Sequence, residues 1–170
     1  MITLGKKTTT VLQVVALVAI AGQALAFRYE FKAPYTCQIP NVGPLEGSTT
    51  GYTTLTPGTV KVGTPTSIAL AVKAPIDSPE DINSWHAAID IDVTGPENVT
   101  VTTEAKGGHF SGGDLISMQL NGTWTPTKPG TYELRPGKAT VTGDVQVYGQ
   151  VTINCTPDDP GTPFKVVTVG

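Results

Sequence analysis

Apolar and polar residues alternate along most of the chain after residue 27. The alternation is clearest in residues 67–72 (SIALAV), 88–93 (AIDIDV), 115–120 (LISMQL) and 139–155. A period of two places every second side chain on the same face of a β-strand, with the apolar residues turned toward a core. Threonine fills many of the polar positions, as is typical of half-exposed strands. The pattern predicts an all-β domain.

Short turn signals divide the alternating segments. They occur at TPG (56–58), VGTP (62–65), TGPEN (94–98), NG (121–122), KPG (128–130) and RPG (135–137). Short strands separated by such turns, without a long helical period, favour an antiparallel β-sandwich of the immunoglobulin-like type.

One segment favours a short helix instead. In residues 77–85 (DSPEDINSW), Ser78 can cap a helix and Pro79 can occupy its first position. Glu80 and Asp81 then lie in the first turn, where the helix dipole stabilises carboxylates. We therefore expect one short helix in an otherwise all-β fold.

The first 26 residues have the pattern of a secretory signal peptide. Lys6 and Lys7 precede an apolar run over residues 11–22, and residues 24–26 (ALA) provide the small side chains that signal peptidase requires. The apolar run is shorter than the about 20 residues that span a bilayer. We expect cleavage after Ala26 and a protein that is secreted, or associated with the cell envelope, and has no membrane span after cleavage.

The remaining chain predicts one domain over residues 27–156, followed by a linker or edge segment over residues 157–170. Its two cysteines, Cys37 and Cys155, lie near the two ends of that domain. In an oxidising compartment an even pair of cysteines indicates a disulfide. A metal site is disfavoured, because the sequence has no CxxC motif and neither histidine lies near a cysteine.

The charge of the chain argues against nucleic acid as a partner. The sequence has 11 basic and 14 acidic residues, for a net charge of −3, and removal of Lys6 and Lys7 makes it more negative by two charges. The charged residues are scattered singly and form no basic patch that could follow a phosphate backbone or an anionic membrane.

Residues near both ends of the predicted domain match one known sequence pattern. Its positions are Tyr35, Cys37, Ile39, Pro40, Gly43, Pro57, Val60, Val62, Gly63 and Pro65, followed at the far end by GQVTINCTPDDPGTP (149–163). This pattern resembles a class of actinobacterial secreted domains of unknown function, from which residues 79–125 depart most. The resemblance implies a disulfide-closed, immunoglobulin-like sandwich at a cell surface or in the medium, and it implies no activity.

The glycine-rich stretch GGHFSGGD (107–114) lies between two predicted strands and predicts the tip of a hairpin. It lacks the strand-to-helix junction and the GxxxxGK[ST] pattern of a phosphate-binding loop. His109 and Ser111 could face the same way, but nothing in a glycine-rich loop orients them as a catalytic pair. We expect no catalysis here, and a contact site at His109 and Phe110, because loop tips are where sandwiches commonly bind.

His86, Asp90 and Asp92 could share one face of a strand as metal ligands, but Ca²⁺ requires six to eight oxygens. A solvated or charge-protected strand face is the favoured alternative, and no metal or cofactor is predicted. Tyr132 in PGTYEL (129–134) resembles the tyrosine corner of immunoglobulin-like domains, which predicts a structural hydrogen bond for its hydroxyl.

The tryptophans allow a second function. Trp85 and Trp124 could stack on sugar rings, with Tyr52 and Tyr148 as possible additions, although tryptophans are also common in sandwich cores. A carbohydrate- or cell-wall-binding module using Trp85 or Trp124 is therefore the alternative prediction.

The favoured function is a secreted, non-catalytic structural or adaptor subunit that contacts another secreted or envelope protein. Residues 27–33 (FRYEFKA) and 164–169 (FKVVTV) alternate without turns, so either could add as a strand to a partner's sheet, or form an ordinary edge strand of the domain. The candidate partner-binding residues are Phe27, Tyr29, Phe31, His109, Phe110 and Phe164.

Overall fold

Alternating residues form nine strands in the computed structural model, which describes residues 27–170. The predicted signal peptide, residues 1–26, lies outside the described residues. The strands are β1 (Phe27–Ile39), β2 (Gly43–Thr56), β3 (Thr66–Asp77), β4 (Ile82–Thr94), β5 (Val99–Gly107), β6 (Leu115–Trp124), β7 (Gly130–Val145), β8 (Gly149–Pro157) and β9 (Lys165–Val169). Residues 27–170 contain no helix long and apolar enough to cross a membrane.

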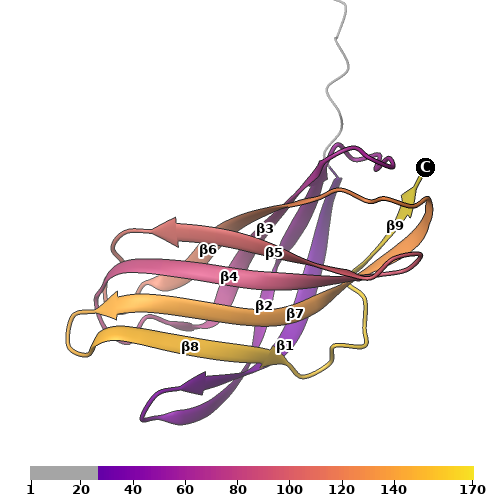
Figure 1. Cartoon of the computed structure of the whole chain (residues 1–170). Coiled ribbons are helices and arrows are strands. Elements are labelled where there is room, and N and C mark those ends of the chain that lie inside the picture. The colour runs from indigo at the N-terminus through magenta and orange to yellow at the C-terminus, as the bar shows by residue number, and fades with distance from the viewer. Residues whose placement is uncertain (1–26) are drawn as a thin grey trace, which may run out of the picture.

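The strands close into a barrel, so the prediction of a sandwich is wrong. The order of hydrogen-bonded neighbours is β4-β5-β6-β3-β2-β1-β8-β7, and a further pairing of β7 with β4 completes the ring. Figure 1 shows β4, β7 and β8 side by side along one wall, with β1, β2 and β3 crossing behind them. In a sandwich the two sheets would keep separate edges, whereas here eight antiparallel strands leave no second sheet.

The length of β7 makes this closure possible. Its residues 133–145 pair with β4, residues 139–145 pair with β8 on the other side, and residues 130–134 pair with β9. The expected turn at RPG lies inside β7, where the register with β4 shifts between Ile89 and Ile91. It is therefore a β-bulge, in which one extra residue bends a long strand rather than ending it.

The other misplaced turn is the Asn-Gly pair inside β6. A Cβ on Gly122 would lie 2.7 Å from the carbonyl oxygen of Thr102 on the neighbouring strand β5. Glycine is required here because another backbone approaches closely, which is the second common reason for glycine in a strand.

The predicted helix over residues 77–85 is also absent, and residues 82–85 belong to β4. The Ser78 amide donates to Asp114 O at 2.8 Å, and Ile82 and Phe110 exchange two backbone hydrogen bonds of 2.9 Å. These bonds tie the segment to the loop after β5. Capping signals set only a local preference, and cross-chain pairing of the same backbone groups overrides it.

The barrel interior holds many of the apolar residues of the alternating segments. The buried ones are Ile68, Leu70 and Val72 of β3, Ala87, Ile91 and Val93 of β4, Val101 of β5, and Met118 and Leu120 of β6. Val147, in the alternating segment 139–155, is instead 66% exposed in the turn between β7 and β8. Tyr132 is fully buried against Trp124, with ring centroids 5.1 Å apart. Its hydroxyl donates to Lys128 O at 2.9 Å, which confirms the structural hydrogen bond predicted for this tyrosine.

The disulfide between Cys37 and Cys155 is confirmed, and it joins residues 118 positions apart. The two cysteines face each other across the short pairing of β1 with β8. The C-terminal segment is part of the fold, because β9 pairs with β7 and Val169 forms a parallel bridge with Val60.

Candidate functional site

Strand β1 is paired unevenly along its length. Its whole length, residues 27–39, pairs with β2, but only residues 35–38 pair with β8. Beyond that, the Asp158 amide donates to Pro34 O at 3.0 Å. Within the described part of the chain, residues 28–33 therefore have a hydrogen-bonded strand on one side only.

The register identifies which backbone groups face the open side. Cys37 and Cys155 have Cα atoms 3.9 Å apart, the close spacing of a pair that does not exchange hydrogen bonds. The backbone groups of Cys37 therefore face β2, and those of alternate residues face the other way, as the Pro34 carbonyl does. By this alternation Arg28, Glu30 and Lys32 present their N–H and C=O groups to the open edge.

A hollow of about 240 Å³ lies along this edge. Residues 30–34 line one side, and Pro136, Asp159 and residues 162–164 line the other. We call it the β1 groove. It separates the open edge of β1 from the segment that leads into β9, so an extended chain can approach the backbone of β1 there.

The two chain ends, predicted separately as partner-binding segments, meet at the β1 groove. The rings of Phe31 and Phe164 are 5.6 Å apart, and Lys165 Nζ lies 3.4 Å from the ring centroid of Tyr29. Phe27 is the first residue of β1 and pairs with Leu55 in register. Phe31 and Phe164 thus form one apolar wall of the groove, although they come from opposite ends of the domain.

A small second hydrophobic core adjoins the β1 groove. It is built from Ala33, Tyr35 and Ala139, with Phe31 packed against them. The Tyr35 hydroxyl donates to Gly137 O at 3.0 Å and so links β1 to β7. Burial raises the pKa of Tyr35 to about 12, and the charges of two nearby aspartates add to the effect.

The sequence carries a signal for this open edge in its charged residues, which the prediction from aromatic residues did not include. Arg28, Glu30 and Lys32 alternate in charge on exposed positions, which is how natural edge strands resist uncontrolled pairing. Lys165, which lies against Tyr29, was likewise not singled out. Only the closure of the barrel brings it next to β1.

The candidate sugar-binding tryptophans lie in different environments. Trp124 is 2% exposed and so presents no ring face to a ligand. Trp85 is half-buried, stacks on Phe110 at 5.8 Å, and lines a hollow of about 360 Å³ with polar neighbours that include Lys106 and Asp144. Sugar binding through Trp85 stays a prediction.

The two tyrosines proposed as additional sugar contacts are far from equivalent. The ring of Tyr52 is covered by Arg28, whose Cζ lies 3.5 Å from the ring centroid. Tyr148 is 69% exposed in the turn between β7 and β8.

The glycine-rich loop connects β5 to β6, which are antiparallel neighbours. Ser111 Oγ lies 3.3 Å from His109 Nε2, but Asp114 accepts from the Ser111 backbone amide and does not contact the imidazole. His109 is exposed, whereas Phe110 lies against Trp85. Contact of His109 and Phe110 with a partner stays a prediction, with His109 exposed and Phe110 partly covered by Trp85.

The three candidate metal ligands are not brought together. His86 pairs with Glu104 at 3.9 Å. Asp90 and Asp92 each accept a hydrogen bond from a threonine on β5, at 2.7 and 2.8 Å. Among residues 27–170 no group of three or more histidine, cysteine or acidic side chains could hold a metal ion.

Comparisons with known proteins establish no family. No protein-family model and no curated protein matches the chain. A solved structure of the C-terminal domain of wzt matches with 12% sequence identity and a TM-score of 0.35, over 87% of this chain and 80% of that one. A TM-score of 0.35 is too low to establish a shared fold.

Proposed function

We propose that this protein is a secreted, non-catalytic adaptor that binds an extended segment of another secreted or envelope protein along the β1 groove. The observation that carries the proposal is the open edge of β1, where Glu30 and Lys32 line a groove instead of pairing with a second strand. The disulfide is consistent with an oxidising, extracellular environment.

The groove has the two components that recognition by strand addition requires. Backbone N–H and C=O groups of the open edge supply affinity for any extended chain, and adjoining side chains supply specificity. Here the apolar wall is Phe31 and Phe164, and the charged positions of the edge are Arg28, Glu30 and Lys32. The occupant that fits is an extended segment with an apolar side chain toward the wall and mixed charges on its exposed face.

The test compares Lys32→Pro with Lys32→Ala. Proline removes the N–H that faces the groove, and the pairing with β2 is kept because it uses the alternate residues. Alanine removes the same side chain but keeps the N–H. Each oxidised variant is immobilised, exposed to the medium of the source cells, and the retained proteins are quantified by mass spectrometry.

We expect a partner that Lys32→Ala retains and Lys32→Pro loses. With that partner present, the amides of Arg28, Glu30 and Lys32 should become protected from hydrogen exchange. A partner retained equally by both variants would contradict strand addition. Protection of the same amides in the protein alone, increasing with its concentration, would instead indicate that a second copy occupies the groove.

A further inference from the structure

A second hollow lies on the outer surface of β4, β5 and β7, and we infer that it binds a neutral carbohydrate. It has its own lining residues, although the segment before β9 borders both this hollow and the β1 groove. Its volume is about 620 Å³. We call it the Arg135 hollow, and its polar lining consists of Asp92, Thr94, Asn98, Thr100 and Arg135.

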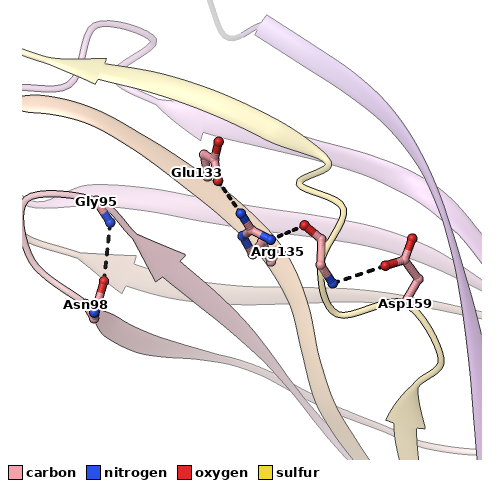
Figure 2. A network of polar contacts seen from close by, with 6 residues as sticks. Gly95, Asn98, Glu133, Arg135 and Asp159 are labelled. Atoms are coloured by element: carbon pink, nitrogen blue, oxygen red, sulfur yellow. Dashed lines mark hydrogen bonds and ion pairs between the residues drawn. The ribbon is translucent and has the colours of Figure 1, made fainter.

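The side chains of the Arg135 hollow are held in place by their neighbours. Figure 2 shows the Arg135 guanidinium between the carboxylate of Glu133 and the carbonyl of Gly161, to which it donates. The Gly161 amide donates in turn to Asp159 Oδ1 at 3.1 Å. Arg135 therefore joins β7 to the segment before β9, and it lines the hollow in a fixed position.

The charges around the hollow favour an uncharged ligand. Asp92 and Arg135 are directly opposite each other on β4 and β7, so the lining carries one charge of each sign. Arg135 is already paired with Glu133. An anionic ligand would meet a compensated guanidinium beside the Asp92 carboxylate, so it gains no net attraction. A metal cation would find a single carboxylate, Asp92, in the lining of the hollow.

The free hydrogen-bonding groups match a polyhydroxylated molecule. Thr100 donates to Asp92 Oδ1 at 2.8 Å, which leaves Oδ2 to accept from a ligand. Asn98 Oδ1 accepts from the Gly95 amide at 3.3 Å, as Figure 2 shows, which leaves its Nδ2 to donate. Sugar hydroxyls both donate and accept, so they can satisfy both kinds of group at once.

The rest of the lining is apolar and suits the C–H face of a sugar ring. Val99 is 39% exposed at the start of β5, and Pro160 lies in the segment before β9. A ligand site with apolar walls and a few placed polar groups is the general pattern of small-molecule recognition. Strand addition at the β1 groove does not require this hollow, so either proposal can fail alone.

The chain offers a matched control for the experiment. Asp92→Asn removes the charged acceptor of the hollow. Asp90→Asn makes the same change two positions away, where Asp90 likewise accepts from a threonine, Thr102, but does not line the hollow. The oxidised protein and both variants are titrated with maltose, mannobiose and N,N′-diacetylchitobiose, and separately with sodium phosphate, and backbone amide shifts are followed by NMR.

We expect at least one of the sugars to shift the amides of residues 92–100 and of Arg135 in the unaltered protein. Asp92→Asn should weaken that binding about tenfold or more, because a charge-assisted hydrogen bond is lost, and Asp90→Asn should leave it unchanged. No shift with any of the three sugars overturns the inference. So do shifts confined to the surroundings of Trp85, shifts with phosphate alone, and equal effects of the two variants.

Discussion

Replacement of Tyr35 by phenylalanine should change stability in opposite directions at neutral and at high pH. The Tyr35 hydroxyl donates to Gly137 O at 3.0 Å in a buried environment. In the neutral range the variant loses that hydrogen bond and leaves the carbonyl without its partner. We therefore expect its free energy of unfolding to be lower by about 1 kcal/mol.

At high pH the same hydroxyl lowers the free energy of unfolding. Burial, helped by the charges of Asp90 and Asp92, raises the pKa of Tyr35 from 10.0 to about 12 in the folded protein. The folded state therefore keeps a proton that the unfolded state loses, and stability falls as the pH rises through that interval. Two pKa units correspond to about 2.7 kcal/mol, and phenylalanine has no such loss.

The variant should therefore become the more stable protein, by about 1–2 kcal/mol, once the pH approaches the raised pKa. Urea unfolding of the oxidised protein and of Tyr35→Phe at a series of pH values measures the difference directly. A titration of tyrosinate absorbance in both proteins assigns the ionisation of Tyr35, because the pKa of the buried Tyr132 is raised as well and only the Tyr35 signal is lost in the variant. A difference in unfolding free energy that stays constant across the pH series would refute the burial of the Tyr35 hydroxyl beside Asp90 and Asp92.

Two further perturbations test the fold. Replacement of Cys37 and Cys155 by serine should lower the free energy of unfolding by up to about 4–5 kcal/mol, because the disulfide closes a loop between residues 118 apart. Denaturant unfolding measures this, and a loss below about 1 kcal/mol would contradict it. Gly107→Ala should cost about 1–3 kcal/mol, because its Cβ would lie 2.4 Å from the Trp85 indole. Gly108→Ala, with no atom within 4 Å of its Cβ, should change stability by less than about 0.5 kcal/mol, and equal thermal shifts in the two variants would contradict the packing of Trp85.

The errors of the sequence-based prediction share one physical cause. The capping pattern at Ser78 describes a local preference, but its amide is bound by Asp114, more than thirty residues away in the sequence. The Arg-Pro-Gly motif has the composition of a turn, yet opposite β4 the same residues form a bulge. In both places a partner strand or loop, which local sequence does not reveal, decides between two conformations that the segment could adopt.

For the candidate sites, too, local sequence indicates individual residues, whereas their contacts depend on the tertiary structure. Phe31 and Phe164 were singled out because they lie in alternating, turn-free segments, and that composition is visible in the sequence. Their contact at the β1 groove is not, because it depends on β9 returning to pair with β7. The Arg135 hollow had no signal at all beyond a few scattered polar residues, since its lining comes from β4, β5, β7 and the segment before β9.

The sequence by itself determined that the chain is predominantly β, that residues such as Ile68, Leu70 and Val93 face inward, and that its two cysteines pair. Each of these follows from the period of the side chains or from residue chemistry. Only the tertiary structure decided that the strands form a closed barrel rather than a sandwich. Both architectures require the same inward and outward alternation along each strand, so the choice depends on whether β7 pairs with β4. That pairing joins segments distant in sequence. The short pairing of β1 with β8 likewise depends on tertiary structure, and it leaves the first half of β1 open as the candidate binding edge.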